Sequence, residues 1–520
     1  MAPTSDLQSQ NAPSPNPVVP SAAITLFAFA SCYFRLFVFP NVPLLPGGDA
    51  LGFVEAGKYI VAGQLPYRDY FQIVPPGTDL AYALLIRLFG LGTWIPPFVM
   101  AALAAMTALL ITLISMRVMR GLAVALPGLF LVGLLLIGSL DGTHHWFSTI
   151  TALAALLVLL GGVTLSRIAA AGALCGLTAC FTQTKGATVL AGFIVYLIWR
   201  AAYDGAPPRQ CLRQCLILIA MAASTFAVAN AYFISAVGLR GWLYWIVVYP
   251  LRYYPAPDLN NWRVVLHDFH WHEGPGRWIA FPFVYATVPL ACIVFLVTTH
   301  RRWKDRTEPW PELVLISLTS IFMFLAVAAS PSIKRLISVG PSSMIPLVWM
   351  LSRPGRITRL LKAGLASAAL VLALVGPVRT QVRWSLDLDL PGGRTAFTDR
   401  GQYEEYAWVL AHTHPGQFFI AMPMYLPFHL LNPAPVGGFD TSEYTRPEQV
   451  TALVRALETH SVPLIILPSS KKYLHATGLP SDHLGPFRDY LCRNYALTQT
   501  FATGDELWEK KETPTSCSLQ

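Results

Sequence analysis

Three basic residues in this sequence lie at the ends of apolar runs, where a cation needs an anionic partner. Lys185 lies in a short polar break between two apolar runs, and Lys334 and Arg335 lie just before another. Cations at the ends of apolar segments need a counter-charge, and phosphate is a group that Lys and Arg bind well. Loop carboxylates or lipid headgroups could serve instead. The residue types therefore indicate a phosphate-binding site, provided that the fold brings these segments together.

The composition identifies the chain as a polytopic membrane protein. Its 520 residues are 54% hydrophobic and only 12% charged, whereas soluble domains carry about 25% charged residues. The formal net charge is +9, but the basic residues form short clusters between apolar runs, as membrane topology requires. This distribution argues against nucleic-acid binding.

The apolar runs predict about eleven transmembrane helices. A span needs roughly 20 residues, and several runs are shorter. The runs 168–182 and 186–199 are also compatible with one long helix broken at Gln183–Gly186. The eleven runs are 22–40, 95–116, 125–140, 148–165, 168–182, 186–199, 214–237, 278–298, 311–329, 338–352 and 363–377.

The distribution of Lys and Arg predicts a cytoplasmic N-terminus. With that orientation the inner loops hold 14 Lys and Arg in 46 positions, against 10 in 112 positions outside, in agreement with the positive-inside rule. Lys185, Lys334 and Arg335 then face outward. The five outer loops are 41–94, 141–147, 183–185, 238–277 and 330–337.

Three parts follow from this topology. Residues 1–21 are rich in Pro, Ser, Asn and Gln and predict a disordered cytoplasmic tail. Residues 22–377 form the transmembrane domain, and residues 378–520 form a small soluble α/β domain on the outer side. Cys492 and Cys517 both lie in this last part, where they could pair or remain free thiols.

The C-terminal domain shows its own local patterns. Segments 400–414 and 445–460 have helical spacing, the second with Thr445 as N-cap and Pro447 in the first turn. Segments 417–423 and 462–468 read as short buried strands.

The first outer loop, 41–94, is long and polar for a membrane protein. Residues 50–63 and 79–90 are amphipathic and too short to span, so we expect helices in the interface plane, with a turn at the Pro-Pro-Gly of 75–77. A loop docked on the bilayer can meet a lipid-linked substrate, because the lipid tail stays in hydrocarbon while its phosphate reaches the interface.

The fourth outer loop, 238–277, is crowded with aromatic residues. These residues suit the bilayer interface, or they form platforms for a sugar ring or a polyprenyl chain. Its histidines have a spacing that fits no standard metal site, and we predict no metal site there. The residues concerned are His267, Asp268, His270, His272 and Glu273.

The order of these motifs resembles a known family. The pattern "GQLPYRDYF" followed by "PPGT" after an early aspartate, then "TQTKG" between two spans and "SIKRLISVGPSS" before another, is similar to the GT-C membrane glycosyltransferases. The resemblance is greatest to the branch of protein O-mannosyltransferases and aminoarabinose transferases. It covers the whole chain and implies a GT-C-like fold.

The resemblance implies an enzyme that moves a sugar from a polyprenyl phosphate to an acceptor hydroxyl, with inversion at the anomeric carbon. Asp49 would be the catalytic base, because the attacking hydroxyl must lose its proton. Lys185, Lys334 and Arg335 would hold the leaving phosphate. A structural alternative for Asp49 is the N-cap of the following helix.

The sequence departs from the family pattern at two places. Many relatives have Asp-Glu where this chain has Asp49-Ala50, which leaves Glu55 or Asp69 to supply a second carboxylate. Relatives often place an acidic residue in the second outer loop just before the next span. Here Asp141 lies a few residues earlier, and His145 is one of two histidines nearer to that position. For Asp69, the alternatives are an ion pair with its neighbouring arginine or capping of a turn.

Two other functions remain open from the sequence: a lipid or glycan transporter or flippase, and a non-catalytic scaffold. The nearly charge-free spans and the crowding of polar groups on one side favour the enzyme. We expect no obligatory cofactor, with a divalent cation as an open alternative. The expected partners are the bilayer, the lipid-linked donor and an acceptor that the sequence does not identify, and the expected location is a bacterial inner membrane.

Overall fold

The computed structural model describes most of the chain. The sequence predictions for the tail up to residue 17, for most of 255–282 and for residues 285–286 fall outside the described residues, as do those for His267, Asp268, His270, His272, Glu273 and Cys517. The described residues are 18–254, 262, 283–284, 287–305, 308–383, 386–421, 424–437, 439, 443–468 and 482–515.

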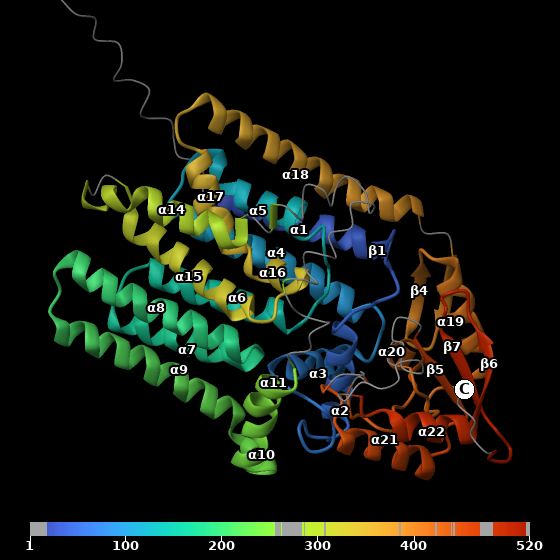
Figure 1. Ribbon diagram of the computed structural model, residues 1–520. Helices are drawn as coiled ribbons and strands as arrows, with labels where there is room; N and C mark the ends of the chain where they lie inside the picture. The colour runs from blue at the N-terminus through green and yellow to red at the C-terminus, as the bar shows by residue number, and fades with distance from the viewer. Residues whose placement is uncertain are drawn as a thin grey trace, which may run out of the picture.

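The molecule is mostly helical, and within the described residues each of the eleven predicted spans coincides with a helical segment (Figure 1). The long helix α1 (Val18–Leu36) begins inside the segment that we predict as a disordered tail. In the part of the chain that the structure describes, six helices are long and apolar enough to cross a membrane: α1, α4 (Ile95–Ser115), α8 (Gln183–Asp204), α9 (Pro208–Val237), α15 (Trp310–Ala328) and α18 (Arg356–Arg383).

Shorter apolar segments complete the bundle. Two of them are α6 (His144–Leu160) and α7 (Leu165–Phe181). Other short helical segments of the described chain, not all of them apolar, are η1 (Gly121–Ala125), α5 (Leu126–Phe130), η2 (Leu131–Leu135), α10 (Leu239–Leu243), η3 (Tyr244–Val248), α11 (Tyr249–Arg252), η5 (Thr287–Ala291), α14 (Cys292–Thr299), η6 (His300–Asp305), α16 (Ile333–Val339), η7 (Pro341–Ser343) and α17 (Met344–Leu351). The fold is therefore that of a polytopic integral membrane protein.

The segment 168–199, for which the sequence left two alternatives, forms two helices. Thr182 between α7 and α8 is extended, with φ −146° and ψ 104°, so the chain reverses there. Glycines on α7 let α9 approach closely: a Cβ at Gly172 or Gly176 would lie 2.4 Å from the carbonyl oxygen of Leu218 or Ala222. Small residues at such crossings are typical of packing within membranes.

The first outer loop contains the two predicted amphipathic helices, α2 (Ala50–Val61) and α3 (Gly77–Phe89). They pack on each other with Gly57 of α2 against the backbone of Tyr82 and Ala83, where a Cβ would come within 3.0 Å. A short antiparallel pair, β1 (Phe37–Val38) and β2 (Val42–Pro43), leads from α1 into this loop. The loop thus forms a folded cap on one end of the bundle.

The C-terminal unit is the predicted small α/β assembly. It has a hairpin of β3 (Leu386–Leu390) and β4 (Gly393–Phe397) and an antiparallel sheet in the order β5–β7–β6, with Ile465 opposite Trp508 and a bulge between Leu497 and Gln499. The sheet strands are β5 (Leu464–Leu467), β6 (Tyr495–Thr500) and β7 (Glu506–Lys510), and the helices are α19 (Arg400–His412), α20 (Tyr425–Phe428), α21 (Pro447–Thr459) and α22 (Gly485–Asn494).

Two local predictions for this unit need correction. Segment 417–423 forms no regular strand among its described residues, only isolated bridges from Phe418 to Leu431 and from Ile420 to Ile465. The N-cap of α21 is Arg446 rather than Thr445. A residue that precedes a proline favours extended backbone angles, so Arg446 stays non-helical and the helix begins at Pro447. The predicted helix of 400–414 and the strand within 462–468 are confirmed.

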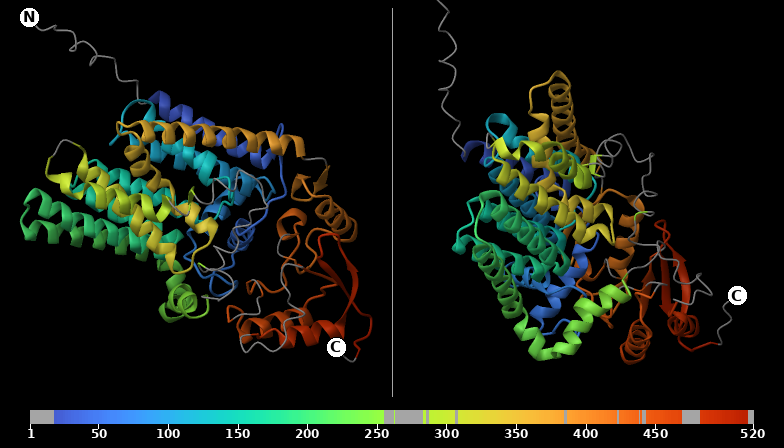
Figure 2. Two further views of the ribbon diagram at one scale, coloured as in Figure 1. Left: turned by 45° about the horizontal axis from the view of Figure 1, so that its top comes forward. Right: turned by 60° about the vertical axis from the view of Figure 1, so that its left-hand side comes forward.

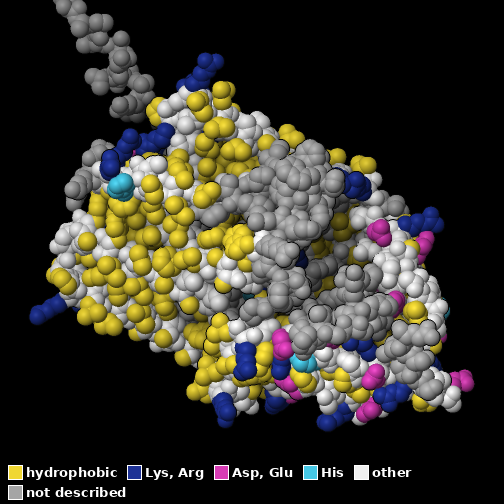
Figure 3. Space-filling model, viewed as in Figure 1, with side chains coloured by type: hydrophobic (Ala, Val, Ile, Leu, Met, Phe, Trp, Pro, Cys, Tyr) yellow, Lys and Arg dark blue, Asp and Glu magenta, His cyan; other side chains and the backbone are white. Residues whose placement is uncertain are grey.

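The C-terminal unit is docked on the first outer loop (Figures 1 and 2). The backbone N–H of Leu45 donates to the oxygen of Ala396 at 2.9 Å, and that of Phe71 donates to the oxygen of Pro435 at 2.7 Å. Figure 3 shows a broad apolar surface over the helical bundle, whereas charged side chains gather over the C-terminal unit. The apolar surface suits lipid, and the docked cap and C-terminal unit lie at one end of it.

Candidate active site

A cavity of about 560 Å³ lies between the helical bundle, the first outer loop and the C-terminal unit. All five segments that we predict as outer loops reach it, which shows that the sequence analysis placed them correctly at one end of the bundle. The residues that line it include Asp49, His144, Lys185, Tyr254 and Arg335 from these five loops, and Tyr444 from the C-terminal unit.

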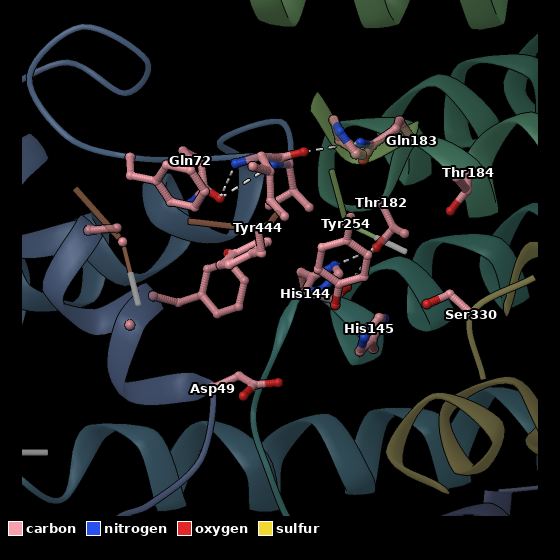
Figure 4. A pocket seen from close by; sticks show the side chains of 18 of the residues that line it. Asp49, Gln72, His144, His145, Thr182, Gln183, Thr184, Tyr254, Ser330 and Tyr444 are labelled. Carbon is pink, nitrogen blue, oxygen red and sulfur yellow. Dashed lines mark hydrogen bonds between the residues drawn. The ribbon is translucent and has the colours of Figure 1, made fainter. Parts of the chain in front are cut away.

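Asp49 extends into this cavity from the start of α2, on the side where His144 and His145 lie (Figure 4). It occupies the N-cap position of α2, yet its side chain makes no capping hydrogen bond, and the residue is exposed. The structural alternative for Asp49, a capping side chain, is therefore not what the structure shows. Its carboxylate is available to a molecule in the cavity.

Asp141 caps α2 in place of Asp49. Its Oδ2 accepts a hydrogen bond from the backbone N–H of Asp49, and its Oδ1 accepts one from that of Ala50, both at 3.0 Å. Lys334 donates to Oδ2 at 3.1 Å. Burial raises the pKa of Asp141, and the charge of Lys334 opposes that rise.

Asp141 and Lys334 line a second, neighbouring cavity of about 310 Å³ rather than the main one. The two cavities share only Gly48. The two residues that we predict as a second acid and a phosphate ligand are thus paired with each other. Among the described residues, neither belongs to the lining of the cavity that holds Asp49.

Glu55 is the second carboxylate of the main cavity. It lies six residues after Asp49, nearly two turns along α2. It accepts a hydrogen bond from the Tyr59 hydroxyl and is hydrogen-bonded to Asn432 of the C-terminal unit. Burial raises the pKa of Glu55 to about 7. A carboxyl with such a pKa in a cleft is a candidate for a functional group.

Asp69, the other predicted acid, lies outside this lining. Its carboxylate pairs with Arg68 at 2.7 Å and accepts the backbone N–H of Leu65 at 2.8 Å. The hydrogen bond from Arg68 lowers the pKa of Asp69. Its contacts are those of the ion pair and turn cap that the sequence left as alternatives.

Arg335 is the basic residue whose side chain faces the main cavity. Its guanidinium donates to the hydroxyl of Tyr254 and, at 2.9 Å, to that of Ser330, and its central carbon lies 5.1 Å from the Tyr254 ring centroid. The neighbouring residue Lys334 turns toward Asp141 instead. One short helix, α16, therefore sends one cation into each cavity.

Lys185 also reaches the wall of the main cavity, but it is fully buried. Its ammonium group donates to the backbone oxygen of His145 at 2.8 Å and to the Thr149 hydroxyl at 2.9 Å. These contacts tie α8 to α6, and the phosphate contact of Lys185 stays a prediction. The charge lies behind His145, which itself lines the cavity.

One buried polar group that supports the cavity lining is not among the residues predicted from the sequence. Asp79, fully buried in the first turn of α3, accepts hydrogen bonds from Gln72 Nε2 at 2.9 and 3.0 Å and from the Tyr70 hydroxyl at 3.1 Å. Burial raises the pKa of Asp79 to about 7. Gln72 and Tyr70 both line the cavity. A signal was present, since a carboxylate two residues after a Pro-Pro-Gly turn lies in the first turn of the helix that follows.

The cavity has several aromatic walls, including Phe53, Tyr59, Phe71, Tyr254 and Tyr444. Such rings suit the apolar faces of a ring-shaped ligand or a hydrocarbon chain. No group of three His, Cys, Asp or Glu side chains within the described ranges has the arrangement of a metal site. The arrangement thus combines carboxylates, an arginine and aromatic surface next to the membrane part.

Comparisons with known proteins agree with this architecture at the level of fold. No protein-family model matches the chain, and no curated protein sequence matches it. Among solved structures, ArnT from Cupriavidus metallidurans bound to undecaprenyl phosphate superposes with a TM-score of 0.60 at 13% identity. The match covers 95% of this chain and 98% of ArnT.

A second solved structure is the archaeal oligosaccharyltransferase AglB from Archaeoglobus fulgidus, in complex with an inhibitory peptide and a dolichol-phosphate. Its TM-score is 0.54 at 13% identity, and the match covers 95% of this chain and 74% of AglB. At this identity the similarity concerns the fold. The chain has the GT-C fold of membrane glycosyltransferases.

Proposed function

We propose that this protein is a glycosyltransferase that moves a sugar from a polyprenyl-phosphate donor to the hydroxyl of an acceptor. The observation that carries the proposal is that Asp49, free of any capping bond, and Arg335 line one cavity at the end of an apolar bundle. The solved structures of the same fold include one with undecaprenyl phosphate and one with dolichol-phosphate, which supports a lipid-linked donor.

In the proposed reaction, Asp49 accepts the proton of the acceptor hydroxyl as its oxygen attacks the anomeric carbon. The bond between that carbon and the phosphate oxygen breaks, and the phosphate leaves with the bonding electrons. Arg335 stabilises the charge that develops on the phosphate. A single displacement of this kind inverts the anomeric centre, and the products are the glycosylated acceptor and the polyprenyl phosphate.

Other side chains support this chemistry. Lys185 holds the backbone oxygen of His145 at 2.8 Å and so keeps this part of the cavity wall in place. Glu55, with a pKa raised to about 7 by burial, is placed to exchange hydrogen bonds with sugar hydroxyls. The aromatic walls of the cavity suit the sugar ring or the first isoprene units. We further propose that the cavity faces the extracytoplasmic side, since all its loops belong to the side poorer in Lys and Arg.

The direct test is an assay of membranes that contain the protein. A set of radiolabelled polyprenyl-phosphate sugars is supplied, and the label on acceptors is measured. Asp49→Asn is expected to lower transfer by about 10²–10⁴-fold, the usual contribution of a general base, while the protein still inserts in the membrane. The assay is run with and without a chelator, so that any need for a divalent cation is seen in the same series.

Asp69→Asn is the matched control, because Asp69 lies in the same outer loop but pairs with Arg68 outside the cavity lining. It should retain wild-type transfer within about threefold, since exposed ion pairs contribute about 1 kcal/mol or less. If Asp49→Asn transfers sugar as well as the wild type, the enzyme proposal is wrong. The protein would then be better explained as a transporter or a non-catalytic scaffold.

A further inference from the structure

Asp141 contacts the backbone at the proposed catalytic residue, and Lys334 binds Asp141. Lys334 is also close enough to Asp49 that, despite burial, the negative charges of Asp49 and Asp141 both raise the pKa of its ammonium group. The two carboxylate oxygens of Asp141 accept the N–H groups of Asp49 and Ala50, each at 3.0 Å, and Lys334 holds one of these oxygens at 3.1 Å. The Asp141 side chain is 8% exposed and that of Lys334 is 43% exposed. The pair therefore fixes the start of α2 from the neighbouring cavity, which it lines.

The residue before Asp49 is adapted to this contact. Gly48 has φ +81°, and a Cβ there would lie 2.5 Å from Oδ2 of Asp141. A side chain at position 48 would be strained and would push the Asp141 carboxylate away. Glycine thus allows a carboxylate to approach the helix start at hydrogen-bonding distance.

The loop that carries Asp141 is itself anchored. The hydroxyl of Tyr82, a fully buried residue of α3, donates to the oxygen of Gly142 at 2.7 Å. The N–H of Thr143 donates to the backbone oxygen of Asp141 at 2.8 Å. Asp141 is therefore held by its backbone, by Lys334 and, through the neighbouring Gly142, by α3.

The start of a helix attracts a negative charge, because its N–H groups are unpaired and its dipole is positive there. An aspartate at the N-cap position normally supplies that charge with its own side chain. In this protein Asp49 holds the N-cap position, but Asp141 supplies the charge. Without Asp141, Asp49 is the nearest carboxylate to replace it and would turn back onto its own helix.

We infer that Asp141 and Lys334 are positioning residues. Asp141 takes over the capping of α2 so that the Asp49 carboxylate remains directed into the cavity, and Lys334 serves Asp141 rather than the donor phosphate. This inference rests on the proposed function of Asp49 as the base. It assigns different tasks to two adjacent residues of α16, since Arg335 faces the main cavity.

The experiment is a double-mutant cycle on the purified full-length protein, with kcat and the KM for the lipid-linked donor measured for each variant. Asp141→Asn is expected to lower kcat by about 10–100-fold, and Lys334→Met by a smaller factor. The donor KM should stay within about twofold for both. In the double variant kcat should be no lower than in Asp141→Asn, because residues that act as one unit are not additive.

Arg335→Met is the matched control from the same helix and should raise the donor KM. Lys334→Arg keeps a cation for Asp141 and should restore kcat to within about threefold of the wild type. If Asp141→Asn fails to fold, which thermal unfolding in detergent will show, the donor KM of Lys334→Met decides the matter.

The inference is overturned if Lys334→Met raises the donor KM as Arg335→Met does. It is also overturned if the double variant loses kcat by the full product of the two single-variant factors. Either result makes Lys334 a phosphate ligand. An unchanged kcat in a folded Asp141→Asn protein would also overturn it. These failures are distinct from failure of the proposed function, which shows as transfer retained by Asp49→Asn.

Discussion

The ammonium group of Lys185 lies 2.8 Å from the backbone oxygen of His145. This contact joins the first turn of α8 to the first turn of α6, and the Ser148 and Thr149 hydroxyls donate to the same oxygen at 2.9 and 2.8 Å. A residue that the sequence presents as a phosphate ligand is thus part of the wall that holds a cavity histidine in place.

Replacement of Lys185 by methionine should therefore leave the donor KM nearly unchanged. The oxygen of His145 keeps two donors, and a buried charge can often be replaced by an apolar side chain of similar size without loss of stability. Arg335→Met should raise the donor KM by about tenfold or more, because charged hydrogen bonds contribute about 1.5–3 kcal/mol. Donor titrations of the two variants side by side make the comparison. A large KM effect in Lys185→Met would show that Lys185 contacts the phosphate directly.

Glu55 should make stability depend on pH in a defined direction. Burial raises its pKa to about 7 in the folded protein, above the unfolded value of about 4.3. The folded state therefore binds its proton more tightly. The contribution of Glu55 to stability is complete below about pH 4 and is lost as the pH rises through about 7.

Glu55→Gln removes this titration and keeps an acceptor for the Tyr59 hydroxyl. The Tm of the variant relative to the wild type should rise between pH 5 and pH 8.5 by at least about 2–4 °C, the shift that about 1 kcal/mol produces in a large domain. Asp79 and Glu405 also have pKa values of about 7, but their effects cancel in the difference. A Tm difference that does not change with pH would contradict the assignment.

The contact between the C-terminal unit and the cavity can be tested at Gly437. This residue has φ +98°, and a Cβ there would lie 2.7 Å from the ring of Phe71, which lines the cavity. Gly437→Ala should displace the ring and change the KM for donor or acceptor by about threefold or more. The control is Gly416→Ala in the same unit, which has φ +83° but nothing within 4 Å. It should carry the backbone strain alone, roughly 1 kcal/mol, and leave both KM values unchanged.

Helix packing within the bundle makes a prediction for Gly133. A Cβ at this position in η2 would lie 2.0 Å from the backbone oxygen of Ala369 in α18, so Gly133→Ala should force the helices apart and lower the Tm strongly, by the equivalent of about 2–4 kcal/mol. Gly364→Ala in α18 meets nothing within 4 Å and should be neutral or stabilising by up to about 1 kcal/mol. Equal Tm values for the two variants would contradict this packing.

Much of the architecture follows from patterns that are local in the chain. Hydropathy predicts the spans because each must bury its backbone within one segment. The unequal distribution of Lys and Arg between the loops predicts that residues 49 and 335 lie at the same end of the bundle. The motif order that resembles GT-C enzymes also agrees with the observed fold.

What the sequence could not reveal depends on contacts between distant segments. Asp141 and Asp49 are 92 positions apart, and no local pattern distinguishes a capping carboxylate from one that faces a cavity. Lys334 and Arg335 are adjacent in the chain, but their different directions depend on where α16 lies against two other loops. The burial of Asp79 likewise comes from the packing of α3 against its neighbours rather than from its position in the sequence.

The walls of the main cavity run from Gly48 to Tyr444 in the chain. During synthesis the helical bundle is complete before Asn432, Gly437 and Tyr444 leave the ribosome. The cavity is therefore enclosed only at the end of translation, when the C-terminal unit folds against a loop that was made first. A nascent chain that stops short of this unit has its acid and its arginine but lacks one wall, so premature termination yields an inserted protein with an open site.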